Sequence, residues 1–449
     1  MTRESWFKVH LADLCESISY GYTQASTSTP NGPKFLRITD IVKGLADWAS
    51  IPYCEIPPNI VERYRLRHGD IVIARTGAST GSSLYIKNPP DAVFASYLIR
   101  LRIKKTVNSR FVSYFLASPQ YKNYIRGVLG DKSAQPNANA KTLTQVELKL
   151  PPLEEQNNIA RMLGSLDDKI ELNRQMDFLL EKIAQALFKH WFIDFEFPDE
   201  GGRPYKSSGG MIEDSGPRKK PRGWELVRLG DLVSLERGLS YKGKFLSQTG
   251  IPMINLGTIA PNYGFIKNGL KWYVGDFLAK QLVAPGDIVL ANTDITQRRE
   301  VLGSPAVVPA DLGSDRILFS HHVYAIRNTS DLPNLYIYYL LQQRSYRDRV
   351  RGFATGTTVL ALPPETILNY TFIKPDNEVL NKFDLIASQL HKQMACSDIE
   401  AAILARIRDL LIPRFMAGLL KLGPDAASEA CNKIGKTISN SQQSLRNWP

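Results

Sequence analysis

The stretch GDIVIARTG, from Gly69 to Gly77, returns as GDIVLANTD from Gly286 to Asp294. Both copies begin with a Gly-Asp pair, which favours a turn, and continue into a short apolar run, which favours a buried strand. Four more blocks recur in the same order: WFKVHLADL (Trp6–Leu14) with WELVRLGDL (Trp224–Leu232), KFLRITDI (Lys34–Ile41) with PMINLGTI (Pro252–Ile259), FASYLIRLR (Phe94–Arg102) with FSHHVYAIR (Phe319–Arg327), and FVSYFLASPQYKNYIRG (Phe111–Gly127) with YIYYLLQQRSYRDRVRG (Tyr336–Gly352). The chain is therefore a tandem duplication of a unit of about 220 residues, which predicts a pseudo-two-fold molecule.

The composition limits the class of protein. The 449-residue chain is 43% hydrophobic and 10% aromatic, which predicts folded domains with apolar cores. No apolar run approaches the roughly 18 residues of a membrane span, and the N-terminal sequence MTRESWFKVHLADL lacks the apolar core of a secretory signal. The four cysteines form no Cys-x-x-Cys pair, which argues against a disulfide framework and a zinc site. These features predict a cytoplasmic protein.

The net charge of +12 is unevenly distributed along the chain. Residues 1–150 carry 20 basic and 11 acidic side chains, and residues 224–375 carry 16 and 12. Between these blocks, residues 151–197 carry only 5 basic against 9 acidic side chains. Basic blocks are typical of proteins that bind a polyanion, because neutralised phosphates release counterions. A basic surface without a nucleic-acid partner fits the charge alone equally well.

Each repeat divides into a globular part and a helical part. Residues 1–150 and 224–375 show short strand patterns and one amphipathic helix, which predicts two α/β domains. Residues 151–197 and 376–422 have helical spacing instead. Residues 198–223 are rich in Gly, Pro and Ser and predict a linker, and the polar residues 423–449 predict a disordered tail.

The helical parts carry a narrow apolar seam of coiled-coil type. A helix from about Glu154 to Lys189 would be roughly 54 Å long. Its seam consists of Ile159, Leu163, Leu166, Ile170, Asn173, Leu180, Ile183 and Leu187. The counterpart in the second repeat consists of Phe383, Ile386, Leu390, Leu404, Ile407 and Leu411. Packing inside a globular bundle is an alternative, but the length and the flanking linkers favour two helices paired antiparallel, with Asn173 setting their register.

The order of these segments resembles the specificity subunit of type I restriction-modification systems. The resemblance rests on LPPLEEQNNIARMLGSLDDKIELNRQ followed by LFKHWFIDF, the restart GGMIEDS and PRGWELVRLGDL, and the closing LLIPRFMAGLL. It covers essentially the whole chain. The restart reads GPRKKPRGW where the family usually has a Glu-rich Pro-Glu-Gly-Trp sequence, and the second helical part is less typical than the first.

The resemblance implies an α+β fold with two tandem pseudo-symmetric α/β target-recognition domains, separated by two long helices in an antiparallel coiled coil. It implies a non-catalytic subunit that reads a bipartite, asymmetric DNA site. The helices would dock two adenine-N6 methyltransferase subunits, which restriction subunits can join. No cofactor is expected on this chain, because S-adenosylmethionine, ATP and Mg²⁺ would belong to the partner subunits. The helix length then predicts two half-sites with an unread gap on the order of half a turn to one turn of DNA.

Other motifs give little support to catalysis. NPPD (Asn88–Asp91) lacks the aromatic residue that an amino-methyltransferase places after Asn-Pro-Pro. GLSYKGKF (Gly238–Phe245) has Phe245 where a phosphate-binding loop needs Ser or Thr. His321 and His322 fall on a predicted strand with side chains on opposite faces, which disfavours a shared metal. A methyltransferase or nuclease with diverged motifs is the alternative function, and S-adenosylmethionine binding by the isolated chain would distinguish it.

Residues that contact DNA are expected in loops of the two domains, because base edges require exposed side chains with reach. In the first domain the candidates are Tyr20, Gln24, Arg75, Thr76, Ser79, Thr80, Lys132, Ser133, Gln135 and Asn137. In the second domain they are Tyr241, Lys242, Lys244, Asn292, Thr293, Gln297, Arg298 and Arg299. For each residue taken singly, an ordinary turn or solvent contact is an equal alternative.

Residues expected to pair the helices and bind partner subunits lie on the seam and just after the first helix. They are Leu163, Leu166, Ile170, Leu180, Trp191, Phe192, Phe195, Leu404, Ile407 and Leu411. The aromatic residues in HWFIDFEF leave two interpretations open, a cap on the coiled coil or a docking point for a methyltransferase subunit.

Overall fold

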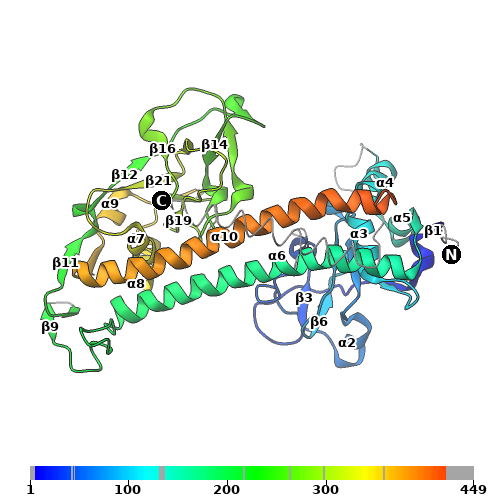
Figure 1. Cartoon of the computed structure of the whole chain (residues 1–449), viewed down its shortest axis with the longest axis horizontal. Helices are drawn as coiled ribbons and strands as arrows, with labels where there is room; N and C mark the ends of the chain where they lie inside the picture. Colours follow the sequence, from blue (N-terminus) through cyan, green and yellow to red (C-terminus); the bar gives the residue numbers. More distant parts are fainter. Residues whose placement is uncertain are drawn as a thin grey trace. The chain divides into compact units, whose positions relative to one another are not determined.

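The computed structural model describes residues 6–420, apart from gaps at 42–43, 45, 131–136, 216–217, 262–263, 297–298 and 357–358. The chain forms two compact units, Met1–Leu172 with Glu400–Pro449 and Asn173–Ile399. The division falls inside two long helices, α6 (Leu153–Phe188) and α10 (Asn377–Met416). Each unit therefore contains one α/β domain and a part of both helices (Figure 1).

The domain of the first unit is built on a four-stranded antiparallel sheet. Its strand order is β2 (Cys15–Tyr20), β7 (Leu98–Ile103), β4 (Ile71–Ala74), β5 (Ser83–Tyr85). Two strand pairs accompany the sheet: β3 (Lys34–Leu36) parallel to β6 (Ala92–Phe94), and β1 (Phe7–His10) antiparallel to β8 (Glu147–Leu150). The helices are α1 (Ile38–Ile41), α2 (Pro58–Tyr64), α3 (Ser109–Ala117), α4 (Pro119–Leu129) and α5 (Ala140–Thr144).

The domain of the second unit repeats this plan with additional strands. The four-stranded sheet has the order β12 (Val233–Arg237), β21 (Val323–Asn328), β17 (Ile288–Ala291), β19 (Pro305–Val307). A five-stranded sheet has the order β13 (Leu246–Ser247), β15 (Lys271–Tyr273), β14 (Ile251–Ile254), β20 (Ile317–Phe319), β16 (Leu282–Val283). Smaller pairs are β11 (Glu225–Arg228) with β23 (Thr371–Lys374), β18 (Thr293–Asp294) with β22 (Leu360–Ala361), and β9 (Ile212–Ser215) with β10 (Arg218–Pro221). The helices are α7 (Asn334–Leu340), α8 (Arg344–Gly352) and α9 (Pro364–Leu368).

The two domains share one topology, as the repeat predicts. The sheet β2-β7-β4-β5 corresponds strand by strand to β12-β21-β17-β19. The parallel pair β3–β6 corresponds to β14–β20, and the ladder β1–β8 to β11–β23. The fold is therefore α+β with two tandem pseudo-symmetric domains.

The repeated Gly-Asp pair begins the same strand in both domains. Gly69 and Gly286 have φ values of 90° and 86°, which only glycine adopts readily. The carboxylate of Asp70 accepts a hydrogen bond from the amide of Arg67 at 2.9 Å and pairs with Arg102 on β7 at 3.2 Å. In the second domain Asp287 makes the same turn contact and pairs with Arg327 on β21 at 3.3 Å. The motif thus closes the turn and joins two adjacent strands.

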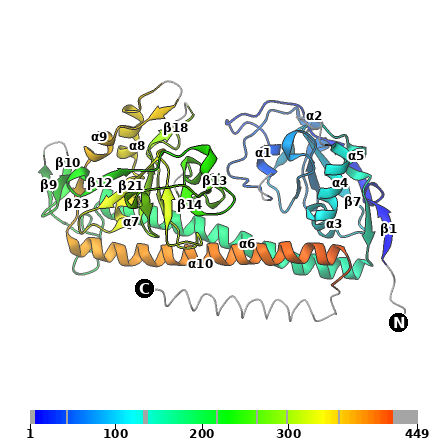
Figure 2. The same cartoon turned by 90° about the horizontal axis from the view of Figure 1, so that it is seen from above.

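Each domain is joined to the start of a long helix in the same way. Its first strand pairs with its last strand, and the last strand runs into the helix after two residues. In Figure 2, β1 lies beside the start of α6 and β23 beside the start of α10. The first tryptophan of each repeat donates its indole N–H to a carboxylate there, Trp6 to Glu155 at 2.9 Å and Trp224 to Asp376 at 3.3 Å.

The long helices pack against each other in opposite directions. In the first unit, Leu166 and Ile170 of α6 form a buried cluster with Leu404 near the other end of α10. The guanidinium of Arg408 binds the Asp167 carboxylate at 2.7 Å in the same unit. In the second unit, Phe188 near the end of α6 packs on residues near the start of α10. This pairing confirms the antiparallel coiled coil, and α6 has the predicted length of 36 residues.

In the second unit the predicted seam is wrong at Ile183 and Ile386, whereas Phe383 is buried as predicted. Ile183 exposes 54% of its surface and Ile386 exposes 39%, whereas the next residues, Ala184 and Ala387, are fully buried. A straight α-helix drifts by about 20° per heptad from a 3.5-residue repeat, so the buried position moves by one residue over several turns. Asn173 remains fully buried, and its amide donates to the carbonyl of Ser397 at 3.3 Å.

Residues 198–223, whose composition predicts a linker, contain regular structure. The ring of Tyr205 stacks on Phe197 with centroids 4.5 Å apart, and Phe197 stacks on Trp224 at 4.8 Å. The β9–β10 hairpin follows. Aromatic stacking therefore fixes a segment that its Gly and Pro content alone marks as a tether.

Two leucines on α6 test the contribution of the helix pairing to stability. Leu166 is 4% exposed in the α6–α10 cluster, whereas Leu172 is 56% exposed. We expect Leu166→Ala to lower the free energy of unfolding by about 2–4 kcal/mol, because it leaves a cavity. Leu172→Ala should change it by less than about 0.5 kcal/mol. Urea unfolding followed by circular dichroism measures both, and equal effects would contradict the pairing.

A carboxyl group between the helices predicts a pH dependence. Burial and, to a smaller extent, the neighbouring carboxylate of Asp398 raise the pKa of Asp177 to about 7. The folded state therefore binds a proton that the unfolded chain has lost, and the stability falls as the pH rises from about 4 to 7. Asp177→Asn should stabilise the protein at pH 8 and have a smaller effect at pH 5. Thermal unfolding at both pH values tests this, and an equal gain at both would count against it.

Candidate nucleic-acid interface

Three distant segments of the first domain meet where β4 ends. The amide of Arg75 donates to the carbonyl of Tyr97 at 3.0 Å, and the amide of Ala138 donates to the carbonyl of Arg75 at 2.8 Å. Thr76 forms an antiparallel bridge with Asn137. The polar residues after the repeated strand are thus placed beside two other loops.

The side chains at this junction form one polar and aromatic group. The guanidinium of Arg75 donates to the Asn137 side-chain oxygen at 3.0 Å and lies 5.0 Å from the centre of the Tyr20 ring. The Tyr20 hydroxyl accepts from the amide of Ala140 at 3.0 Å. Tyr20 is 45% exposed and Tyr97 60% exposed. Arginine, amide and aromatic side chains on one exposed surface are the groups that contact phosphates and base edges.

The second domain has the same junction. The amide of Asn292 donates to the carbonyl of His322 at 3.1 Å, and the amide of Leu362 donates to the carbonyl of Asn292 at 2.8 Å. Thr293 pairs with Ala361 in the β18–β22 ladder. These contacts occupy the positions of the Arg75, Tyr97 and Ala138 contacts in the first repeat.

The side chains of this second junction are different. The Thr293 hydroxyl and the His322 Nδ1 are 3.0 Å apart, and the His321 and His322 rings lie 3.9 Å apart. The Tyr241 ring is 6.1 Å from the His321 ring, and its hydroxyl accepts from the Lys271 ammonium at 2.7 Å. The same backbone frame therefore presents Arg and Tyr in one domain and Lys, Tyr and His in the other.

The prediction for the two histidines is wrong. His321 and His322 form a turn before β21, so their rings are adjacent and do not point to opposite faces of a strand. The alternation of side chains along a strand begins only at Val323, because residues 321–322 form the turn that connects β20 to β21. Burial lowers the pKa of His322, and the nearby charges of His321, Arg237 and Lys271 lower it further.

A glycine allows a further segment to approach each turn. A Cβ atom at Gly21 would collide with the carbonyl oxygen of Ala95, and one at Gly238 would collide with that of Ser320. The residues that follow these glycines form parallel bridges to the same positions, Ala95 and Ser320. Only glycine permits this contact, which explains its presence at the same place in both repeats.

The structure brings seven of the predicted DNA-contacting residues to the two junctions: Tyr20, Arg75, Thr76, Asn137, Tyr241, Asn292 and Thr293. Asn292 is 3% exposed, and its side-chain amide donates to the carbonyl of His321 in the turn at 3.0 Å. Gln24, Lys242 and Lys244 are exposed, Ser79 and Thr80 are half-buried in the turn after β4, and Arg299 donates to the carbonyl of Arg351. Lys132, Ser133, Gln135, Gln297 and Arg298 lie outside the described residues.

Sequence reasoning missed Tyr97, Lys271 and the histidine pair as parts of these surfaces. A signal for the turn is present in the repeat. Just before β7 the first copy has Ser96–Tyr97, and just before β21 the second copy has His321–His322. In both copies a Phe lies two residues before the turn, and an apolar residue follows it. Lys271 lies on β15, and no sequence signal connects it with Tyr241.

Most of the predicted partner-binding residues are used inside the chain. Leu163, Leu166, Ile170 and Leu404 are buried between helices, and Trp191 and Phe192 are 7% and 5% exposed. Phe195 packs against the same aromatic core as Trp191, whereas Leu180, Ile407 and Leu411 are half-buried. The buried side chains are therefore hardly accessible to a partner, and contact of a partner with the half-buried ones stays a prediction.

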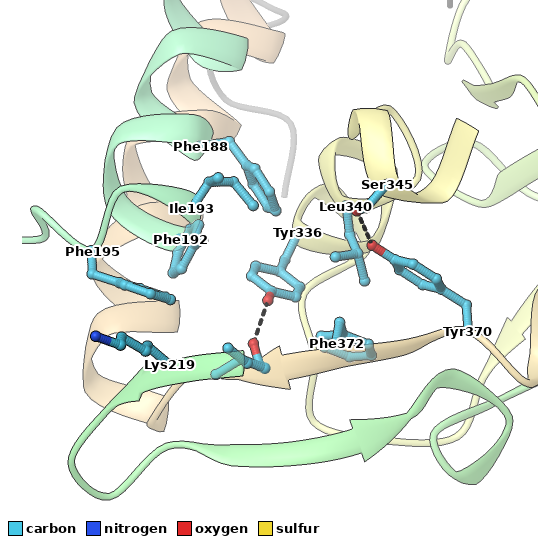
Figure 3. Close-up of a pocket in the computed structure, with 11 residues that line it drawn as sticks. Phe188, Phe192, Ile193, Phe195, Lys219, Tyr336, Leu340, Ser345, Tyr370 and Phe372 are labelled. Atoms are coloured by element: carbon cyan, nitrogen blue, oxygen red, sulfur yellow. Dashed lines mark hydrogen bonds between the residues drawn. The ribbon is translucent and has the colours of Figure 1, made fainter. Parts of the chain in front are cut away.

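An apolar pocket of about 310 Å³ lies at the aromatic residues that follow α6. Phe188, Phe192 and Tyr336 line it, and the Tyr336 hydroxyl donates to the carbonyl of Ile373 at 3.4 Å. The nitrogen of Lys219 points away from these rings (Figure 3). The pocket is also lined by Ser345 and Tyr370, whose hydroxyl oxygens are 2.8 Å apart.

Among the described residues, no group of three or more His, Cys, Asp or Glu side chains is arranged to hold a metal ion. None of the helices described in the structure has both the length and the apolar composition needed to cross a membrane.

Comparison with known proteins agrees with this architecture. Residues 3–182 match the model of a family described as the type I restriction modification DNA specificity domain. The MjaIX type I specificity subunit of Methanocaldococcus jannaschii is 26% identical, over 79% of this chain and 76% of its own length. The HindI specificity subunit of Haemophilus influenzae is 23% identical, over 92% and 99%.

A solved structure gives the same fold. The S subunit of a type I restriction-modification system from M. genitalium has a TM-score of 0.51 at 14% identity, covering 92% of this chain and 96% of that one. Two duplicated α/β domains on paired long helices are thus the fold that this chain shares with that subunit. Over most of its length the chain is similar to the specificity subunits of type I restriction-modification systems, and residues 3–182 match their DNA specificity domain.

Proposed function

We propose that this chain reads a bipartite, asymmetric DNA site, with one half read by each α/β domain. The observation that carries this proposal is the pair of equivalent junctions at the ends of β4 and β17. Both have the same backbone contacts and carry exposed or half-buried polar and aromatic side chains, but the side chains differ. Two frames with unlike side chains support two half-sites with unlike sequences.

The charge distribution supports binding to double-stranded DNA. The chain carries a net charge of +12, and its excess of basic residues lies mainly in the two globular blocks. Arg75 places a cation beside the Tyr20 ring, and Lys271 places one beside the Tyr241 ring. A DNA phosphate could bind to either cation. Phosphate contacts of this kind position a protein, while base contacts select the sequence.

We propose further that the helices dock two adenine-N6 methyltransferase subunits in the cytoplasm, and that restriction subunits join this complex. In the second unit, Phe178, Leu179 and Ile183 on α6 and Leu385 on α10 each expose more than half of their surface. Exposed apolar residues on a helix favour a protein partner. S-adenosylmethionine, ATP and Mg²⁺ would bind to those partners and not to this chain.

Exchange of one domain tests the two-reader function. A chain whose residues 1–150 come from a relative of different specificity is expressed with the methyltransferase subunits, and methylated sites are mapped by sequencing. We expect one half of the site to change and the other half to stay the same, because each junction lies within a single domain. A matched chain with residues 224–375 exchanged should change the other half. If either exchange altered both halves, independent reading would be excluded.

The docking surface can be tested separately. Leu179→Asp with Ile183→Asp places two charges on exposed positions, so folding should change little. We expect co-purification with the methyltransferase subunits to fall at least tenfold, because an apolar contact would bury unpaired carboxylates. Ile295→Asp, at a residue 70% exposed in the second domain, is the matched control. Unchanged co-purification of the double variant would place the partner elsewhere.

A further inference from the structure

Two short turns hold the same place in the two domains. Ser96–Tyr97 leads into β7, and His321–His322 leads into β21, which are neighbours of β4 and β17 in the central sheets. The amide of Ser96 donates to the carbonyl of Tyr22 at 2.8 Å, and the amide of His321 donates to that of Leu239 at 2.9 Å. The first residue of each turn is thus fixed by the same hydrogen bond.

Two more hydrogen bonds are shared. The amide of Leu98 donates to the carbonyl of Ala95 at 2.9 Å, as that of Val323 does to Ser320 at 2.9 Å. The carbonyl of each second residue, Tyr97 or His322, accepts from the residue after the repeated strand. A turn held at three points on a sheet is rigid, and rigid elements place side chains accurately against a ligand.

We infer that these two turns select the bases of the two half-sites, with Tyr97 setting the first half and His321–His322 setting the second. This inference rests on the proposed DNA-reading function and names the residues that carry its specificity. The backbone of the turn is common to both repeats, whereas its side chains differ: Ser and Tyr in the first copy, and two His in the second. Two domains of one fold can recognise different DNA sequences if the same backbone turn carries different side chains in each.

The surroundings of Tyr97 suit contact with a base edge. Tyr97 is 60% exposed, more than Tyr20 at 45%. Its carbonyl is tied to Arg75, whose guanidinium is held by Asn137 and the Tyr20 ring. The Tyr97 hydroxyl can donate and accept a hydrogen bond, and its ring can pack on a thymine methyl or a base face.

The surroundings of the histidine pair also suit a base. The Nδ1 atom of His322 is engaged by the Thr293 hydroxyl at 3.0 Å, which leaves Nε2 for a ligand. The lowered pKa of His322 keeps its ring neutral at pH 7. A neutral imidazole makes a directional hydrogen bond to a base edge, whereas a phosphate would attract the charged form. The cation needed for a phosphate is supplied by Lys271, which binds the Tyr241 hydroxyl.

Three variants in the full complex with methyltransferase subunits test the inference. They are Tyr97→Ala, His322→Ala and the double variant His321→Ala with His322→Ala. Phe7→Ala, at an aromatic residue 55% exposed in the first domain, and His190→Ala, at an exposed histidine of the second unit, are matched controls. Methylated sites are mapped by sequencing, and unfolding temperatures are measured for every variant.

We expect Tyr97→Ala to reduce discrimination by about tenfold at positions in one half-site only, because a lost base contact weakens the preference for the correct base at that position. The histidine variants should have the same effect on the other half alone, and the controls should leave both halves unchanged. The conservative variants Tyr97→Phe and His322→Gln retain packing and cover the case in which an alanine variant fails to fold. Each should still alter preference in its own half.

Unchanged site preference in folded variants, or a change spread over both halves, would overturn the inference. The domain exchange described above decides the proposed function independently. If exchanging residues 1–150 changes one half-site while Tyr97→Ala leaves it intact, bipartite reading stands and the turn is not its reader. If the wild-type complex methylates no bipartite site, the proposed function itself fails.

Discussion

The shortness of the connection between each domain and its long helix is the constraint on which the rest of the structure depends. Two residues separate β8 from α6 and β23 from α10, and the neighbouring strands β1 and β11 pair with the connecting strand. The indole N–H of the first tryptophan in each repeat then binds a carboxylate at the start of the helix. A domain held by a strand pair and a side-chain hydrogen bond has little freedom to turn on its helix, so its junction keeps one orientation to that helix.

The two repeats have the same backbone contacts at these turns, but their exposed side chains differ. The Gly-Asp turn, the ion pair to the neighbouring strand and the glycine that contacts the turn are present in both domains. Few substitutions are compatible with these features, because the glycines are required sterically and the aspartates form ion pairs. The exposed side chains of the same turns are under no such constraint, and there the two copies differ. Within one segment, the contacts that stabilise the fold are therefore common to both copies, while the exposed side chains are not.

The sequence predicted the parts of the fold that depend on local pattern. The buried strand after each Gly-Asp pair, the helix that starts behind Pro151–Pro152 and the seam at Leu166 and Ile170 follow from periodicity and turn chemistry. The seam shifted to Ala184 because helical drift and the fit between two helices decide which face is buried. Composition could not reveal the stacking of Phe197 on Trp224. The predicted strand was extended through His321 and His322, where the structure has a turn. Much of the candidate site was found because it follows a repeated strand; Lys271 was not, because only tertiary packing places it beside Tyr241.

The buried hydrogen bond from Asn173 to the Ser397 carbonyl has a consequence for how such a chain can evolve. On either side of it, Leu166 is matched to Leu404 and Phe188 to Phe383. An insertion in one helix alone would separate these matched sets and place Asn173 against an apolar neighbour at a cost in stability. Length changes are then tolerated only in whole heptads and only when both helices acquire them. The two helices are thus expected to change length together in the history of this chain, although more than two hundred residues separate them in the sequence.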